Sequence, residues 1–326
     1  MKVALWAAVV AAGLTQAASS GPLVLIQTIN LPGVEGRIDH LAFDGPRQQM
    51  FVAALGNNTV EVLDLAKGVH GRSLSGFHEP QGIAFLADSN LVAVANGQSG
   101  DLVLLNASDG SVKRTVPLSE DADNVRYDSE AKRVYVAHGS GAISAVDPST
   151  GRVVGTVSLP GHPESFQLEQ SGNRIYANVP GAGIVAVINR QTMKVDATWP
   201  VAGAKANYPM ALDESGHRLL IGCRQPARIL IYDTVSGKQT GTIDISGDTD
   251  DLFFDAARKR LYVSCGEGFI EVFHGDAGGG FTRTGHVATA AGARTSLYVP
   301  KQNRLYLAVP HRGDQKTEIR VYDVRD

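Results

Sequence analysis

The chain repeats one pattern seven times. A mostly polar residue, which we call the axial position, recurs at intervals of 41–44 residues and precedes a short apolar stretch in each repeat. These axial residues are Asp39, Gln81, Asp123, Glu164, Tyr208, Asp250 and Arg294. A second set, in the middle of the next apolar stretch, keeps the same rhythm: Val52, Val94, Val136, Ala177, Ile221, Val263 and Leu307. A period of about 40–45 residues with several strands per unit is typical of a β-propeller blade.

Alternating apolar residues and turn signals divide each repeat into four short antiparallel strands. In the second repeat we expect strands at 82–85, 91–95, 102–105 and 112–116, joined by turns of Asp, Asn, Ser and Gly. The seventh repeat supplies three strands, the last at 318–324, and an unassigned strand at 23–31 has the outer-strand pattern. The sequence therefore predicts an all-β, seven-bladed β-propeller with four-stranded antiparallel blades. The N-terminal strand closes the ring, which removes open sheet edges.

Residues 1–18 have the pattern of a secretory signal peptide. Lys2 gives a positive start, the apolar run 3–14 is too short to span a membrane, and Thr15-Gln16-Ala17 offers small residues for cleavage. We expect residues 19–326 to form a single propeller domain without a transmembrane segment, exported to the periplasm or secreted, and monomeric. A formal net charge of -3 over 326 residues disfavours a nucleic-acid binder.

One blade motif resembles that of a known family. The stretch Lys-Arg-Val-Tyr-Val-Ala at 132–137, followed by Ile-Ser-Ala-Val-Asp at 143–147, is similar to the YVTN-type repeat of YncE-like propellers. Arg-Lys-Arg-Leu-Tyr-Val-Ser at 258–264 repeats it. The resemblance covers the chain after residue 18 and implies the fold and family. It leaves the activity open, because related propellers include lactonases, a copper-containing selenium-binding type and haem d1 carriers, and a fold alone identifies no function.

The axial residues should converge at one mouth of the propeller axis. Four of the seven are carboxylates, and carboxylates repel one another unless a cation, a proton or a guanidinium lies among them. We expect the carboxylates to hold a cation or an ammonium group, and the arginines to hold an anionic group. The expected ligand-binding residues are Asp39, Asp123, Glu164, Asp250, Arg294, Arg224 and Asn96. A polar channel filled only with solvent is the structural alternative.

A metal ion is the second kind of ligand that the mouth residues suggest. Cys223 and Cys265 end the second strands of neighbouring blades, and we expect two free thiols there, because a disulfide needs Cα atoms within about 7 Å. Together with histidines they form a candidate soft site for copper or zinc. The candidate metal ligands are His40, His138, Cys223, Cys265 and His311. The carboxylates by themselves suit calcium.

Whether the protein is an enzyme stays open at this point. The sequence has no Gly-x-Ser-x-Gly motif. His162, Glu164 and Ser165 are close in the sequence, but consecutive strand residues point to opposite faces, so we expect these three not to converge. The favoured hypothesis is an exported YncE-like propeller that binds a small polar ligand or a metal ion at the axial mouth. The alternatives are a metal-dependent enzyme at that mouth, either a lactonase or hydrolase or a copper-type oxidase, and a protein-interaction scaffold.

Overall fold

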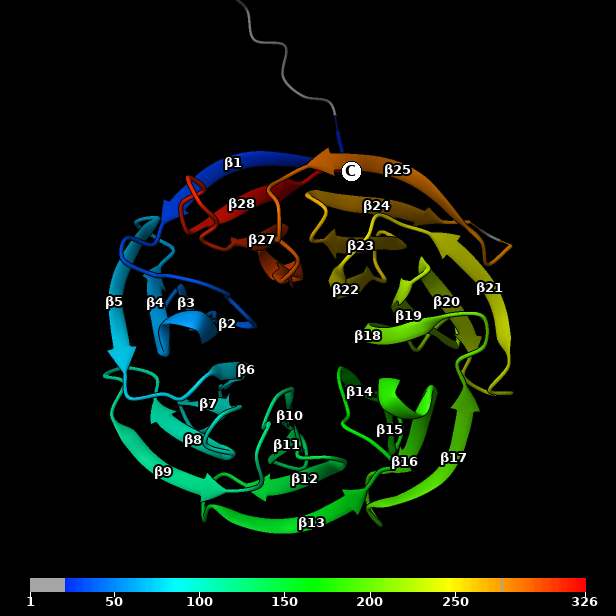
Figure 1. Ribbon diagram of the computed structural model, residues 1–326, viewed down its shortest axis with the longest axis horizontal. Helices are drawn as coiled ribbons and strands as arrows, with labels where there is room; N and C mark the ends of the chain where they lie inside the picture. The colour runs from blue at the N-terminus through cyan, green and yellow to red at the C-terminus, as the bar shows by residue number, and fades with distance from the viewer. Residues whose placement is uncertain (1–20, 277) are drawn as a thin grey trace, which may run out of the picture.

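A computed structural model of the chain describes residues 21–276 and 278–326. Across these residues, seven four-stranded antiparallel sheets stand as blades in a ring around a central axis (Figure 1). The predicted all-β, seven-bladed architecture is therefore confirmed. The signal peptide predicted at residues 1–18 lies outside the described residues.

The first four blades follow one another in chain order. Blade 1 contains β2 (Leu41–Asp44), β3 (Gln49–Ala54), β4 (Thr59–Asp64) and β5 (Val69–Ser75). Blade 2 contains β6 (Pro80–Leu86), β7 (Leu91–Asn96), β8 (Asp101–Asn106) and β9 (Val112–Pro117). Blade 3 contains β10 (Val125–Asp128), β11 (Arg133–His138), β12 (Ala142–Asp147) and β13 (Arg152–Ser158). Blade 4 contains β14 (Phe166–Leu168), β15 (Arg174–Val179), β16 (Ile184–Asn189) and β17 (Lys194–Pro200).

The last three blades complete the ring. Blade 5 contains β18 (Lys205–Asp213), β19 (Arg218–Gln225), β20 (Ala227–Asp233) and β21 (Gln239–Asp244). Blade 6 contains β22 (Thr249–Asp255), β23 (Arg260–Cys265), β24 (Phe269–Gly275) and β25 (Phe281–Ala288). Blade 7 contains β26 (Ser296–Val299), β27 (Arg304–Val309), β28 (Glu318–Val324) and β1 (Leu23–Asn30). Three short 3₁₀ helices lie in loops: η1 (Leu55–Asn57), η2 (Pro180–Ala182) and η3 (Pro300–Gln302).

The N-terminal strand closes the ring as predicted. β1 pairs antiparallel with β28, from Leu23 opposite Val324 to Asn30 opposite Glu318. In Figure 1 the blue and red ends of the chain meet in this blade. Closure by the two ends of the chain leaves no sheet open for pairing with another molecule at this point.

The innermost pairing has the same register in every blade. The residue two positions after each axial residue lies opposite a member of the second repeating set. These pairs are Leu41–Val52, Ile83–Val94, Val125–Val136, Phe166–Ala177, Met210–Ile221, Leu252–Val263 and Ser296–Leu307. The two sequence repeats therefore mark structurally equivalent positions, and each axial residue lies at the start of an innermost strand.

The hydrophobic core lies between neighbouring blades. Seven clusters of buried apolar side chains fill the seven interfaces between blades. Between blades 4 and 5, for example, the Trp199 ring lies 5.4 Å from the Tyr176 ring and 6.0 Å from the Tyr232 ring. This packing fixes the blades relative to one another, so that the inner strands present their first residues around one axis.

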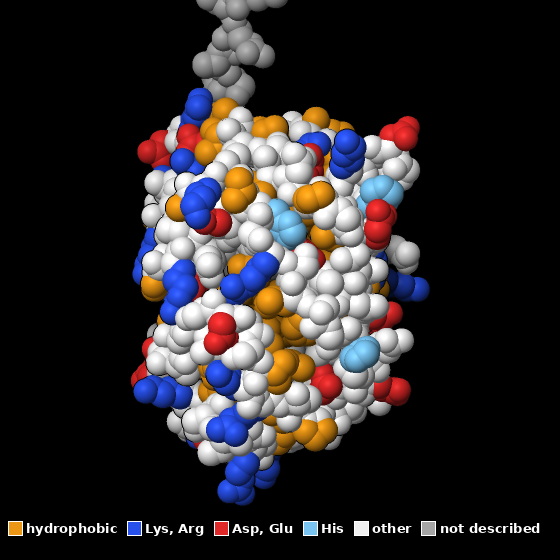
Figure 2. All heavy atoms as spheres, turned by 90° about the vertical axis from the view of Figure 1, so that its left-hand side faces the viewer, with side chains coloured by type: hydrophobic (Ala, Val, Ile, Leu, Met, Phe, Trp, Pro, Cys, Tyr) orange, Lys and Arg blue, Asp and Glu red, His pale blue; other side chains and the backbone are white. Residues whose placement is uncertain are grey.

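The outer strands form a mixed surface. Figure 2 shows one side of the ring, where charged side chains of both signs are interspersed with apolar ones. The exposed apolar residues include Ile26 on β1, Val69 on β5 and Val112 on β9, which belong to separate blades. Within the described residues, no helix has the length and apolar character needed to cross a membrane.

Candidate functional site

A polar cavity of about 250 Å³ lies where the innermost strands begin. All seven axial residues line it, as the repeat predicts. The other lining residues are Arg37, His40, Asp121, Asn124, His162, Ser165 and Arg224. Every one of these side chains carries a polar or charged group, so the cavity suits a polar occupant and offers little to an apolar one.

A β-bulge at the start of the inner strands turns two consecutive side chains toward the cavity. In blade 1, the amide of Asp39 donates to the carbonyl of Ala53 (2.8 Å), and the amide of Ala53 donates to the carbonyl of His40 (3.0 Å). The pairs Asp123–Asn124 and Glu164–Ser165 share one partner residue in the same way. Register shifts place an extra residue at the same point in blades 2, 5 and 6. Two residues oppose one at a bulge, which redirects side chains.

This bulge corrects the prediction for His162, Glu164 and Ser165. All three line the cavity, although strand alternation predicted that they would not converge. The prediction was wrong because residues 161–165 precede β14 and do not follow a regular strand. The axial residue and its successor therefore both face the cavity in blade 4.

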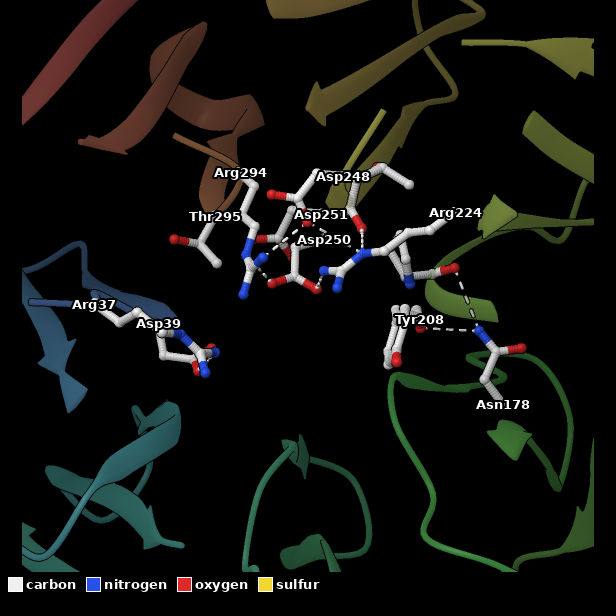
Figure 3. Close-up of polar contacts among 12 residues, drawn as sticks. Arg37, Asp39, Asn178, Tyr208, Arg224, Asp248, Asp250, Asp251, Arg294 and Thr295 are labelled. Carbon is white, nitrogen blue, oxygen red and sulfur yellow. Dashed lines mark hydrogen bonds and ion pairs between the residues drawn. The ribbon is translucent and has the colours of Figure 1, made fainter. Parts of the chain in front are cut away.

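Arginine and aspartate side chains form one side of the cavity, on blades 5 to 7 (Figure 3). Asp250 accepts a hydrogen bond from Arg224 Nη2 (2.6 Å) and forms an ion pair with Arg294 Nε (2.8 Å). Asp248 accepts from Arg294 Nη1 (2.8 Å). Burial raises the pKa of Asp250, although the two guanidinium groups act to lower it. We call Arg224 and Arg294 the guanidinium pair.

Each member of the guanidinium pair keeps one terminal nitrogen without a partner among residues 21–276 and 278–326. Arg224 uses Nε on the carbonyl of Thr249 and Nη2 on Asp250, and its guanidinium carbon lies 4.2 Å from the centre of the Tyr208 ring. Arg294 uses Nε and Nη1, so the contacts leave Nη1 of Arg224 and Nη2 of Arg294 uncommitted. In Figure 3 the free ends of both groups point toward the open centre.

Asp39 and His40 form a tight pair on blade 1. Asp39 contacts His40 Nδ1 through one carboxylate oxygen (2.5 Å) and Arg37 Nη2 through the other (3.3 Å). Burial acts to lower the pKa of His40, but the charge and hydrogen bond of Asp39 outweigh it, and the pKa rises to about 10. Burial acts in the opposite sense on Asp39, whose pKa is lowered by His40 and Arg37. The two side chains therefore stay charged at neutral pH.

Acidic side chains and an imidazole form the opposite side of the cavity, on blades 3 and 4. His162 Nε2 lies 3.9 Å from Asp123 Oδ2, and Nδ1 lies 3.4 Å from Asp121 Oδ2. One ligand atom each of Asp123, His162 and Glu164 lies within 4.8 Å of the other two. Burial, Asp123 and the more distant carboxylates raise the pKa of Glu164 to about 8, against the opposing charge of His162. We call these three residues the acid–imidazole cluster.

The residues two positions before the axial ones form an outer rim, in which Asp121 and Asp248 are site residues that the axial positions did not predict. Arg37, Asp121 and His162 occupy this position and line the cavity, and Asp248 occupies it and pairs with the guanidinium pair. The signal was present in the same sequence repeat, because every member lies two residues before an axial residue. Comparing the residues two positions before the axial residue in all seven repeats identifies them.

Five of the predicted site residues lie outside the cavity lining, namely Asn96, His138, His311 and the two cysteines. Asn96 is buried in blade 2, where it accepts from the amide of His78 and donates to Asp101. His138 is buried between the hydroxyls of Ser119 (2.7 Å) and Ser144 (2.8 Å), and burial lowers its pKa. His311 pairs with Glu35 (2.9 Å) in a separate hollow.

The two cysteines are free, but they do not face the mouth. Both are fully buried, in the apolar clusters on either side of blade 5. Burial raises the pKa of Cys223 to about 12 and that of Cys265 further. The expected soft-metal set of His40, His138, Cys223, Cys265 and His311 is therefore not assembled. In the part of the chain that the structure describes, the acid–imidazole cluster is the group whose ligand atoms converge.

A larger hollow of about 570 Å³ lies between the turns of blades 3 and 4. Its central charged groups are paired with each other, since Arg190 contacts Asp128 (3.1 Å) and also donates to the carbonyl of Gly172. The axial cavity differs because some of its donors and acceptors have no partner among the residues that the structure describes.

Comparison with known proteins supports the fold alone. No family model matches the chain, and no curated protein matches it. A chain in a crystal structure of the mitotic checkpoint complex is similar, with a TM-score of 0.78 and 14% sequence identity over 100% of this chain and 98% of that chain. At this identity the similarity extends to the seven-bladed β-propeller fold and carries no function.

Proposed function

We propose that the axial cavity binds a small polar ligand that carries an anionic group. The observation that carries this proposal is the pair of uncommitted terminal nitrogens of Arg224 on blade 5 and Arg294 on blade 7, on either side of the blade 6 carboxylates that hold them. Guanidinium groups recognise carboxylates and phosphates through fixed, paired hydrogen bonds. Asp248 and Asp250 hold the two groups in place, so little side-chain freedom is lost when a ligand binds.

The opposite side of the cavity favours a ligand with a cationic or hydrogen-bond-donating end. Asp121, Asp123 and Glu164 lie there, and Ser165 and Asn124 add smaller polar groups. A small zwitterion would place its anionic end on the guanidinium pair and its cationic end on these acids. The cavity volume of about 250 Å³ limits the ligand to a compact molecule.

We further propose that this is an exported protein of the YncE-like type, acting in the periplasm or outside the cell. The Tyr-Val-containing blade motifs support the family assignment, and the charged start and short apolar run in residues 1–18 support export. Secretion of the full-length chain with cleavage near Ala17 tests the second point.

A metal-dependent lactonase or hydrolase at the same mouth is the second candidate, favoured by the acid–imidazole cluster. A copper-type oxidase loses its basis because Cys223 and Cys265 are buried away from the cavity. An interaction scaffold is the third candidate. It differs from the others by requiring that substitutions in the cavity leave function intact.

A thermal-shift screen of small amino acids, dicarboxylates and phosphorylated metabolites tests the ligand proposal. A ligand present at 100 times its dissociation constant stabilises the folded protein by about 2.7 kcal/mol. We expect a member of the panel to raise the melting temperature of the wild type. The double variant Arg224→Lys/Arg294→Lys keeps both positive charges but loses the branched guanidinium groups. The ligand should therefore no longer raise its melting temperature.

Arg152→Gln, an exposed arginine on β13, is the matched control and should keep the shift. A panel in which nothing stabilises the wild type contradicts the proposal. So does a ligand whose stabilisation is the same in the double variant.

A further inference from the structure

The acid–imidazole cluster has the donor set of a metal site. We propose that Asp123, His162 and Glu164 bind a divalent cation of the zinc class, with one coordination position open to the axial cavity. Each residue offers one ligand atom, and the three atoms lie within 4.8 Å of one another. Imidazole nitrogen and carboxylate oxygen are ordinary zinc ligands, and three protein ligands with an open position are typical of accessible zinc sites.

The tautomer of His162 is fixed by a backbone contact. His162 Nδ1 lies 2.7 Å from the carbonyl oxygen of Gly139, and a carbonyl only accepts, so Nδ1 carries the hydrogen. Nε2 is left facing Asp123 Oδ2 at 3.9 Å, too far for a hydrogen bond. Metal-binding histidines usually donate their second N–H to a carbonyl or carboxylate in this way. A zinc ion with bonds of about 2.0–2.2 Å would bridge the gap after a small contraction.

An unpartnered buried oxygen in the same cavity points to a missing donor. Asn124 lines the cavity beside Asp123 and is only 3% exposed, yet its side-chain oxygen has no hydrogen-bond partner in the described part of the chain. A buried acceptor left unpaired is costly, so a donor brought to it by a ligand at the cluster would be stabilising. Water held on the open metal position can donate to Asn124.

The charges around the cluster also favour a cation. Within the described residues, no lysine or arginine forms an ion pair with Asp121, Asp123 or Glu164. The guanidinium pair is held on the other side of the cavity by Asp248 and Asp250. A divalent ion would supply the missing positive charge between the carboxylates. This inference does not depend on the anionic end of the proposed ligand, since zinc would contact neither Arg224 nor Arg294; at Asp123 and Glu164 the zinc ion would take the place of a cationic ligand end.

Calorimetric titration of the full chain with zinc chloride tests the proposal. The protein is purified without a histidine tag and treated with a chelator beforehand. We expect saturable binding of one zinc ion per chain, and binding at least about tenfold weaker in His162→Ala and in Glu164→Gln. His274→Ala removes an exposed histidine on β24 and should bind zinc as the wild type does.

Arg224→Lys separates this proposal from the previous one, because it should weaken the anionic ligand and leave zinc affinity unchanged. The zinc site is refuted if the wild-type protein does not bind one zinc ion per chain in the titration. It is equally refuted if His162→Ala binds zinc as tightly as His274→Ala, once circular dichroism shows both variants folded.

Discussion

Asp39 and His40 show how single residues set the charge of the cavity. They are neighbours in sequence, and the bulge in blade 1 turns both toward the axis, where their side chains meet at 2.5 Å. Asp123 and Asp251 add to the field that keeps His40 protonated. The cavity therefore contains its own counter-charges, and its carboxylates do not all need an external cation. The remaining charged side chains form two sides of the cavity, one made by the guanidinium pair and its aspartates and the other by the acid–imidazole cluster.

The raised pKa of His40 predicts a pH dependence of stability. The pKa is about 10 in the folded state, against about 6.5 in an unfolded chain, so the native state holds the extra proton between these values. The stabilisation is complete below about pH 6.5 and is lost as the pH rises toward 10, by up to about 1.4 kcal/mol per pH unit. Urea unfolding of wild type and His40→Gln between pH 7 and 9.5 measures the difference.

The difference between the two curves reports His40 together with the carboxyls whose pKa values its charge lowers, which are Asp39, Asp250 and Asp251. The stability advantage of the wild type should shrink steadily with pH. An advantage that stays constant across the range contradicts the assignment.

The buried thiols predict low reactivity. Burial raises the pKa of Cys223 to about 12, and Cys265 is also fully buried. The thiolate is the reactive form, so a thiol reagent at neutral pH should label neither residue in the folded protein and both after unfolding. Rapid labelling of one or both cysteines in the native state would show that they are accessible at the mouth.

At the scale of the strand, the bulges decide how far the sequence could predict the site. The repeat located the strands, their pairing and the closing strand, because equivalent positions recur at nearly constant spacing. Strand alternation failed at His162 and Ser165, because a bulge depends on backbone hydrogen bonds that spacing does not reveal. The prediction that the two cysteines lie at the mouth failed for a different reason. Two equivalent strand ends can face either the axis or the next blade.

Gly82 tests how closely two bulged strands approach. A Cβ added at this residue would overlap the carbonyl oxygen of Asp123 in the next blade and lie 2.8 Å from the amide of Val125. Gly82→Ala should therefore destabilise the protein by about 1–3 kcal/mol, since backbone atoms cannot move aside cheaply. Urea unfolding measures the loss.

Gly181→Ala is the control, because a Cβ at Gly181 meets no atom within 4 Å. Equal stability of the two variants would mean that blades 2 and 3 are farther apart than described.

At the scale of the whole molecule, the closed ring holds the cavity in shape. The cavity is lined by residues from all seven blades, so its geometry depends on every interface between blades. The interface between blades 7 and 1 is distinctive because blade 7 is built from both ends of the chain. Loss of β1 would open blade 7 and loosen the positions of Arg294 and Asp39 together.

Two isoleucines on β1 can be used to measure how much this closure contributes to the stability of the fold. Ile29 is 2% exposed in the cluster that joins blades 7 and 1, whereas Ile26 on the same strand is 46% exposed. Ile29→Ala should destabilise the fold by about 2–5 kcal/mol, and Ile26→Ala by much less. Thermal unfolding compares the two, and equal losses would contradict a closing role for the buried face of β1.

A crystal structure of the protein with the strongest stabiliser from the small-molecule panel would show where the ligand binds. We expect an anionic group bound between Nη1 of Arg224 and Nη2 of Arg294, inside the axial cavity. A ligand bound on the outer strands or in the hollow between blades 3 and 4, with the axial cavity holding only water, would contradict this expectation.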